Sequence, residues 1–232
     1  MEISPDSLIV WEFGFIKLNA TILYTWLIMG ILILGSWLVS RNITDWFTLS
    51  KMQNVMEVIL GGVMQQIEEI SQQDARPYLP FVGSLFLFIL TSNMLAVVPG
   101  FQPPTGSLST TAALAVCVFV AVPFFGIRAQ GLQGYLKQYL QPTPVMLPFN
   151  IIGELSRTLA LAVRLFGNMM SGGLIAAILL TIVPLFFPVL MQALGLLTGV
   201  IQAYIFSVLA MVYIASATRA HSGQSTQTSK ND

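Results

Sequence analysis

Long runs of mostly apolar residues without a charged side chain dominate the pattern of this chain. The runs extend from Leu18 to Ser40, from Pro77 to Ile127 and from Leu165 to Thr218. About 20 apolar residues are enough for an α-helix to cross the hydrocarbon layer of a bilayer, which is roughly 30 Å thick. The first run therefore predicts one membrane-spanning helix, and each of the longer runs has room for two.

Proline and glycine residues mark the places where the longer runs turn back. Pro99-Gly100 and the segment 103–106 interrupt the second run, and Pro184 and Pro188 interrupt the last. Such residues favour turns over helix interiors. Residues 128–150 contain two basic side chains and several glycines and prolines, and predict a polar connection on a membrane face. The predicted spans are residues 18–40, 78–98, 107–127, 150–182 and 188–218.

Residues 50–73 have a different pattern, in which apolar side chains recur at steps of three and four and charged side chains fall between them. This spacing puts the apolar side chains on one face of a helix. We expect the helix to lie along the membrane surface, although the same pattern also fits an amphipathic helix packed on another part of the protein. The apolar positions are Met52, Val55, Met56, Ile59, Leu60, Val63, Met64, Ile67 and Ile70.

The two ends of the chain are polar. Residues 1–17 lack the basic start of a cleaved signal peptide, so we expect this segment to be retained outside the membrane. Residues 219–232 predict a disordered cytoplasmic tail. The whole pattern predicts a single all-α integral membrane domain with five transmembrane helices plus one amphipathic surface helix, in which the last two spans form a long hairpin.

Composition supports the membrane assignment. Hydrophobic residues make up 55% of the 232 residues and charged residues only 9%, whereas soluble domains have about 25% charged residues. The ten basic and ten acidic side chains balance, and no basic stripe is present for a nucleic-acid partner. The single cysteine, Cys117, and the single histidine, His221, form no cluster of metal ligands, so we expect no metal or other cofactor.

Basic residues are distributed unevenly between the two predicted membrane faces. One face has seven of them, and the other has only Lys17. Because basic loops remain in the cytoplasm, the N-terminus is predicted outside and the C-terminus inside, in a bacterial inner membrane or an equivalent energy-coupling membrane. The seven are Arg41, Lys51, Arg76, Arg128, Lys137, Arg219 and Lys230.

Arg164 needs an explanation because it lies within the fourth predicted span. A charged side chain at the centre of a bilayer costs about 2.5 to 3.5 kcal/mol, so it is a candidate functional residue that requires a partner or water. No acidic residue follows it before Asp232. Helical spacing predicts a polar stripe of Arg157, Leu161, Arg164, Asn168 and Ser171, with Val163 and Met170 on the opposite side.

Other polar residues in the last two spans also have structural explanations. Glu154 lies three residues before Arg157, a spacing that favours an ion pair with a structural role. Polar groups in membrane helices often join neighbouring helices by hydrogen bonds. Among the polar residues of the last span, Gln202 is a candidate functional residue as well as a candidate for such a hydrogen bond. The polar residues of the last span are Gln192, Thr198, Gln202, Tyr204, Ser207 and Tyr213.

Several motifs in order along the chain carry a family resemblance. The most specific motif is Arg164-Leu165-Phe166-Gly167-Asn168-Met169. Three motifs precede it, at Asn93 to Gly100, Ser109 to Ala115 and Pro148 to Glu154, and one follows it, at Gln202 to Phe206. Together they make residues 78–218 resemble the a subunit of the F-type rotary ATP synthase, the stationary half of its membrane ion channel.

The resemblance implies two half-channels that couple the flow of protons, or sodium ions, to rotation of a c-subunit ring. It places the family's essential arginine at Arg164, the neighbouring asparagine at Asn168 and the last-helix glutamine at Gln202. The acidic partner of Arg164 is then a carboxylate of the ring. The implied partners are the c-subunit ring, the peripheral-stalk b subunits, the remaining ATP synthase subunits and the lipid bilayer. Since ATP chemistry belongs to other subunits, this chain is not expected to be catalytic.

One departure from the family pattern concerns the outer half-channel. Many members have Glu after the glycine in Asn-x-x-x-Gly-Glu, whereas this chain has Gly172-Gly173, and the complementary position in the last helix is Gly195. We therefore expect Asn93, Ser171, Thr198 or water to line the outer half-channel.

Three other classes of protein fit the sequence less well. A multispan secondary ion transporter is consistent with midplane charges, but no repeat relates the two halves of the chain. A membrane enzyme is disfavoured because the common hydrolase, zinc-protease and phosphate-loop motifs are missing from the sequence. A purely structural assembly subunit would tolerate Arg164→Ala without loss of coupling.

Overall fold

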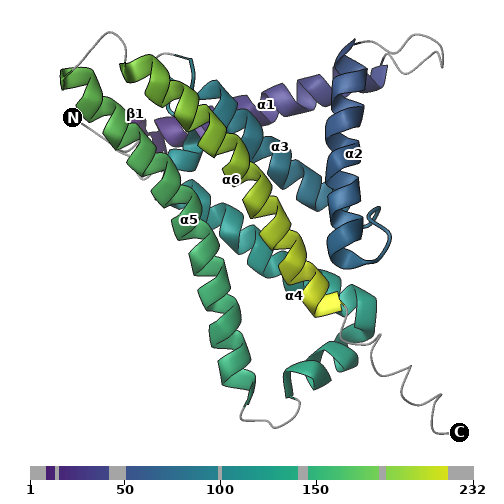
Figure 1. The fold of residues 1–232 in the computed structure, drawn as a ribbon. Helices are drawn as coiled ribbons and strands as arrows, with labels where there is room; N and C mark the ends of the chain where they lie inside the picture. Colours follow the sequence, from purple (N-terminus) through teal and green to yellow (C-terminus); the bar gives the residue numbers. More distant parts are fainter. Residues whose placement is uncertain are drawn as a thin grey trace, which may run out of the picture.

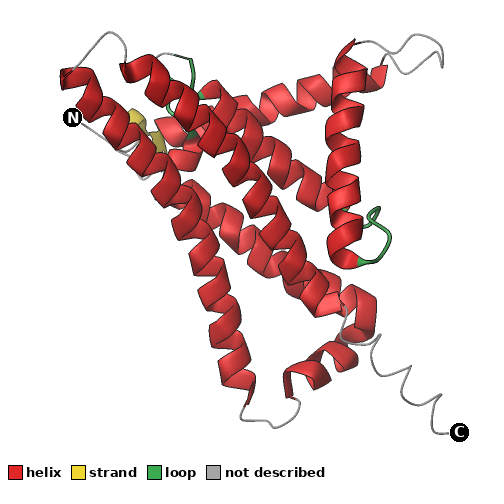
Figure 2. Ribbon diagram, viewed as in Figure 1, coloured by secondary structure: helices red, strands yellow, loops and turns green. Residues whose placement is uncertain are grey.

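The computed structural model describes residues 9–13, 16–41, 51–98, 101–140, 146–182 and 187–218. A short pair of strands precedes a bundle of α-helices, as Figure 1 and Figure 2 show. The elements are β1 (Ile9–Phe13), β2 (Ile16–Asn19), α1 (Ala20–Arg41), α2 (Lys51–Ser71), α3 (Leu79–Leu95), the 3-10 turn η2 (Pro104–Gly106), α4 (Leu108–Leu140), α5 (Met146–Ile182) and α6 (Phe187–Thr218).

Four of the helices are long and apolar enough to cross a membrane. α3 is also apolar, but its 17 residues rise only about 25 Å. Apart from the two short strands, the prediction of an all-α integral membrane protein is confirmed for the described residues. The four candidate spans are Ala20–Leu38, Leu108–Tyr135, Leu147–Leu179 and Val189–Thr218.

The strands β1 and β2 were not predicted. They pair antiparallel immediately before α1, with Trp11 opposite Leu18 and Phe13 opposite Ile16. Strands of five and four residues are too short to leave a clear alternation of apolar and polar positions in the sequence. The charged residues of 1–17 therefore indicated only a polar segment.

α4 extends into the segment that was predicted as a polar connection. The helix continues to Leu140 and bends at Gly131, whose φ of +77° is strained for any residue with a side chain. Beside the bend, Gln130 Nε2 donates a 2.8 Å hydrogen bond to the carbonyl oxygen of Ala217 on α6. The break at Gly131 lies within the segment predicted as a polar connection, and the residues after it form a second helical stretch up to Leu140.

The amphipathic pattern over 50–73 corresponds to α2, and part of its apolar face packs on the protein itself. Ile67 is buried, and Val63 and Ile70 are half-buried against the core that α3 and α6 share. The hydroxyl of Tyr204 on α6 donates a 2.8 Å hydrogen bond to Gln66 Oε1. Figure 1 shows α2 running across the direction of α1, beside α3 and α6. Of the two interpretations of the pattern, the structure supports packing on another part of the protein.

α6 lies at the centre of the bundle, where it contacts α2, α3, α4 and α5. Ala203 and Ala210 are buried along it together with Phe206 and Ile214. Small residues allow membrane helices to approach closely, which matters because lipid supplies no hydrophobic driving force between helices. α1 is largely exposed, including Trp26, as is typical of a helix that faces lipid.

α5 and α6 are much longer than a bilayer is thick. They contain 37 and 32 residues, which correspond to lengths of about 55 and 48 Å. A helix that exceeds the roughly 30 Å hydrocarbon layer accommodates the excess by tilting. The two helices run in opposite directions through the bundle (Figure 1).

Candidate functional site

Arg164 lies on the exposed side of α5. Its neighbours Leu161 and Leu165 are 2% and 0% exposed, and they hold α5 against the bundle. Within the described residues, no hydrogen bond or ion pair reaches the Arg164 guanidinium. A charge on a membrane helix requires a partner or water. The described part of this chain does not supply the partner.

The exposed stripe of α5 is rotated relative to the predicted one. Leu161, which helical spacing placed on the stripe, is buried, and Val163, which was placed on the opposite side, is 57% exposed. The prediction was wrong for these two residues because it chose the face of the helix by its charged and small residues. It took no account of which side chains the other helices bury. Asn168 is half-buried at the edge of the stripe. The exposed residues on this side of α5 include Ser156, Arg157, Ala160, Val163, Arg164, Gly167 and Ser171.

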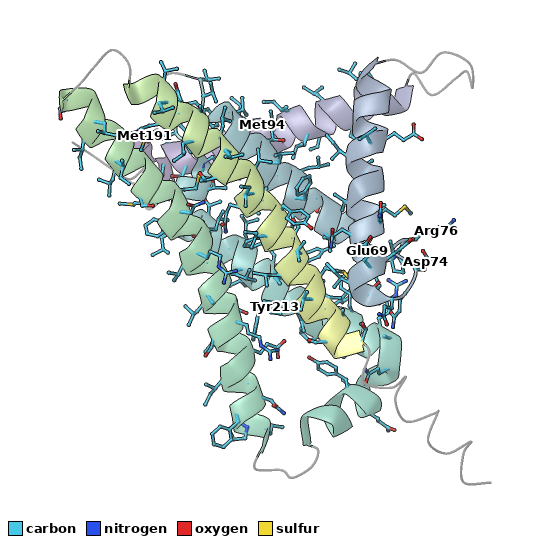
Figure 3. All side chains as sticks on the ribbon, viewed as in Figure 1. Glu69, Asp74, Arg76, Met94, Met191 and Tyr213 are labelled. Atoms are coloured by element: carbon cyan, nitrogen blue, oxygen red, sulfur yellow. The ribbon has the colours of Figure 1, made fainter. Side chains whose placement is uncertain are left out.

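Arg157 connects α5 to α6. Its Cζ lies 5.8 Å from the centroid of the Tyr213 ring, a distance within the range of a cation–π interaction. Figure 3 labels Tyr213 between the two helices. Glu154, one turn earlier on α5, is half-buried, and its ion pair with Arg157 stays a prediction.

Gln202 is buried, with 5% exposure, and its Nε2 has no hydrogen-bond partner among the described residues.

A cavity of about 200 Å³ lies between the α3–α4 connection, α5 and α6. It brings together Asn93, Asn168 and Thr198 from three helices, but Arg164, Ser171 and Gln202 do not line it. A Cβ atom added at three of the lining glycines would meet nothing within 4 Å, so these glycines leave space open. They are Gly172, Gly173 and Gly195.

Other lining residues were not singled out as a group by the sequence. They include Gln192, whose Nε2 donates a 3.2 Å hydrogen bond to the carbonyl oxygen of Val97, together with Met191 and Pro103. These residues line one cavity only because α3, α5 and α6 pack together, and that packing is not visible in the sequence. Figure 3 labels Met191 and Tyr213 towards opposite ends of α6.

Asn93 forms part of the cavity wall and also joins α3 to α6. Its Nδ2 donates a 2.8 Å hydrogen bond to the carbonyl oxygen of Gly199, and its Oδ1 accepts a 2.8 Å hydrogen bond from Thr105 Oγ1. With 2% exposure, the amide is fixed in one orientation. The geometry therefore gives Asn93 a structural role at this position, and its predicted role in ion transfer stays a prediction.

Comparison with known proteins identifies the family. The sequence profile described as "ATP synthase A chain" matches residues 22–215. This chain belongs to that family. It is 61% identical over 219 residues to ATP synthase subunit a 2 of Acaryochloris marina, an alignment that covers 94% of each chain. It is also 61% identical to ATP synthase subunit a of Albidiferax ferrireducens, over 94% of this chain and 95% of the relative.

A third relative, ATP synthase subunit a 1 of Chlorobaculum parvum, is 61% identical over 94% of this chain and 97% of its own length. The resemblance to the a subunit of the F-type ATP synthase is thus confirmed. Membership of the family assigns the chain to ATP synthesis and proton transport, as a subunit of the membrane sector in a bacterial membrane. Catalysis of the ATP reaction belongs to other subunits of that enzyme.

Proposed function

We propose that this chain is the stationary ion-channel subunit of a rotary ATP synthase, and that Arg164 faces the carboxylates of a rotating c-subunit ring. The observation that carries the proposal is the exposed guanidinium on α5 that has no partner within the described residues. Ala160, Gly167 and Ser171 lie exposed on the same stripe. Small side chains there permit close approach of another helix.

The charge of Arg164 determines what happens to a passing carboxylate. A guanidinium stays protonated at any physiological pH. At 4 Å and an effective dielectric constant of 20, its attraction favours the ionised carboxylate by about 4 kcal/mol. A ring carboxylate that arrives opposite Arg164 is therefore driven to release its proton, and the same positive charge repels cations that would otherwise leak directly across the membrane.

The outer half-channel in this proposal is the cavity between α3, α5 and α6. Asn93, Asn168, Gln192 and Thr198 contribute polar side chains to its lining. A water molecule takes up about 30 Å³ of the liquid, so a cavity of about 200 Å³ has room for about six. Gly172, Gly173 and Gly195 leave this space open. By the resemblance described above, the position of Gly173 carries a glutamate in many members of the family.

The proposed topology has five transmembrane helices, with α3 as the shortest, and the amphipathic helix α2, which packs on α3 and α6 at the membrane surface. The N-terminus lies outside and the C-terminus in the cytoplasm, because seven of eight loop basic residues then fall inside. The ring, the peripheral-stalk b subunits and the other synthase subunits are the partners. The transported ion is the proton, as in the family to which the chain belongs. Each elementary charge that crosses 100 mV supplies about 2.3 kcal/mol, so several ions per turn drive synthesis of ATP elsewhere in the complex.

The test is the pair Arg164→Ala and Arg164→Lys in the assembled complex, reconstituted into vesicles. Both variants should insert and assemble normally, and both should lose ion-driven ATP synthesis and ATP-driven pumping. Lysine fails because its compact ammonium lacks the planar guanidinium and loses its proton more readily when desolvated. Full pumping by Arg164→Ala would show that the charge has a structural role and that the ion path runs elsewhere.

A further inference from the structure

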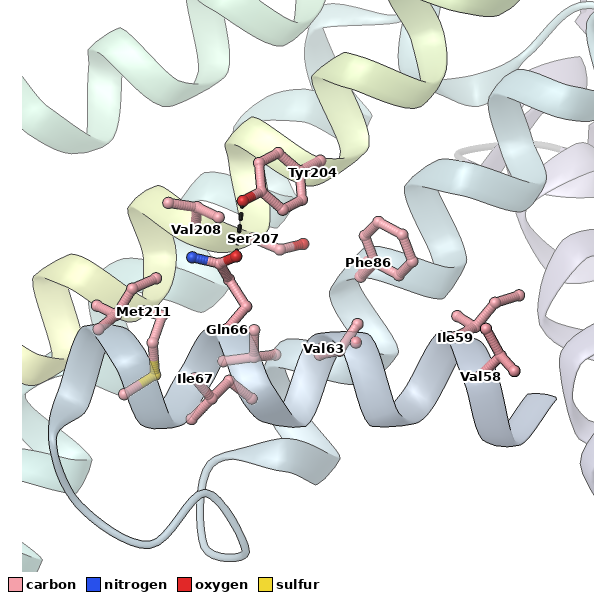
Figure 4. A pocket seen from close by; sticks show the side chains of 13 residues that line it. Val58, Ile59, Val63, Gln66, Ile67, Phe86, Tyr204, Ser207, Val208 and Met211 are labelled. Atoms are coloured by element: carbon pink, nitrogen blue, oxygen red, sulfur yellow. Dashed lines mark hydrogen bonds between the residues drawn. The ribbon is translucent and has the colours of Figure 1, made fainter. Parts of the chain in front are cut away.

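A second cavity, of about 290 Å³, lies between α2, α3 and α6, away from Arg164. Its floor is formed by buried side chains, among them Ile67, Val82 and Met211. Its mouth is bordered by the exposed Val58 and Tyr204. Figure 4 shows the lining side chains of α2 facing those of α6, with Phe86 of α3 at one end. The cavity therefore has a closed apolar floor and an open side.

The side-chain oxygen atoms of Gln66, Tyr204 and Ser207 in the lining already form hydrogen bonds within the protein. The Tyr204 hydroxyl donates to Gln66 Oε1 at 2.8 Å, and Ser207 Oγ donates to the carbonyl oxygen of Ala203 at 3.0 Å. A water molecule in a cavity needs two to four polar partners, and apolar cavities stay dry. A peptide segment would bring backbone N–H and C=O groups that need partners too. The lining therefore suits an apolar occupant.

The size and the surroundings of the cavity restrict that occupant further. An apolar cavity of about 150 Å³ binds a benzene molecule, so this one is large enough for part of a hydrocarbon chain. A helix about 10 to 12 Å in diameter does not fit inside it. A void of this size left empty would deprive its lining of dispersion contacts. The chain is embedded in a bilayer, whose acyl chains are the nearest material to fill it.

We propose that this cavity binds one acyl chain of a membrane lipid, which lies between α2 and α6 and helps to hold α2 against the bundle. The proposal concerns lipid binding and does not depend on how Arg164 or the outer cavity conducts ions. Its failure would leave the proposed ion-channel function untouched.

Two adjacent glycines of α2 provide a matched pair for the test. A Cβ atom at either Gly61 or Gly62 would meet nothing within 4 Å, so the first atom of a larger side chain meets no obstacle at either position. Only Gly62 lines the cavity. Gly62→Leu should therefore fill the cavity, whereas Gly61→Leu adds the same side chain outside it. Val208→Phe fills the cavity from the α6 side and provides a second variant.

The experiment uses the assembled complex in phosphatidylethanolamine–phosphatidylglycerol vesicles that contain a trace of phospholipid with a photoreactive diazirine in its acyl chain. After irradiation, mass spectrometry maps the labelled residues. We expect labelling in residues 58–70 and 204–211 of the unmodified chain, a severalfold decrease in Gly62→Leu and Val208→Phe, and no decrease in Gly61→Leu. Proton pumping by the same samples checks that each variant complex is intact.

Three results would overturn the proposal. The first is labelling that avoids the cavity lining in the unmodified complex. The second is an equal effect of Gly61→Leu and Gly62→Leu. The third is labelling of the lining in the isolated subunit that disappears in the assembled complex, since a partner subunit would then cover the cavity in place of lipid.

Discussion

Gly199 is a position where one added methyl group should disturb the contact between two helices of the bundle. It lies on α6 against Asn93 of α3, and a Cβ atom there would come within 2.9 Å of Asn93 Cβ and 3.3 Å of its Cγ. Asn93 Cβ is attached directly to the backbone and cannot rotate away. Gly199→Ala therefore forces α3 and α6 apart.

The magnitude has two parts. Overpacking of a well-packed site typically costs about 1 to 3 kcal/mol. The separation also lengthens the 2.8 Å hydrogen bond from Asn93 Nδ2 to the Gly199 carbonyl oxygen, and such a bond contributes about 0.5 to 1.5 kcal/mol. The gain in helix propensity from Gly to Ala offsets up to about 1 kcal/mol. The expected net loss of stability is about 0.5 to 4.5 kcal/mol.

The assay compares Gly199→Ala with Gly195→Ala in thermal unfolding of the reconstituted complex. Gly195 lies one turn earlier on α6, and a Cβ atom there meets nothing within 4 Å. We expect Gly195→Ala to be neutral or slightly stabilising and Gly199→Ala to unfold at a clearly lower temperature. Equal stability of the two variants would refute the close α3–α6 contact.

Three further predictions concern the ring, the buried glutamine and the topology. A cysteine at the exposed Gly167 should crosslink to a cysteine on the carboxylate helix of the ring. A cysteine at the buried Leu165 should not crosslink. The reverse result would show that the other face of α5 meets the ring. Gln202→Leu should leave unfolding unchanged or slightly stabilised, because it removes a buried amide with an unpaired Nε2, and it should reduce pumping less than Arg164→Ala does. Reporter fusions to residues 219–232 should score cytoplasmic, and an extracellular score would contradict the proposed topology.

The helices of the bundle were predictable because their signals are long and local. Charge-free runs of 20 or more residues leave few alternatives to membrane helices. The amphipathic spacing over 50–73 likewise predicted α2. What that spacing did not determine was its surroundings, since Ile67 packs on the protein by the same face that would suit a membrane surface. Whether the apolar face of α2 meets lipid or protein therefore depends on the position of other helices, which the sequence of α2 does not contain.

Features that depend on distant parts of the chain were not predictable. The Asn93–Gly199 contact joins residues 106 positions apart, and neither residue signals the other in the sequence. The cavity with Asn168 and Thr198 exists only because three helices meet there. On α5, the choice between Leu161 and Val163 as the buried residue follows from how α4 and α6 are placed, and helical spacing alone does not supply that placement.

The excess length of α5 over the thickness of a bilayer has a consequence for the geometry of the ion path. On an upright helix, residues at different positions would differ only in depth. On an inclined helix, part of the distance from Arg157 through Arg164 to Asn168 is measured sideways in the plane of the membrane. Under the function proposed above, an ion that enters near Asn168 and one that leaves beyond Arg164 towards Arg157 are then offset along the circumference of the ring. In that proposal, the inclination of α5 gives the ion path a component along the direction of rotation.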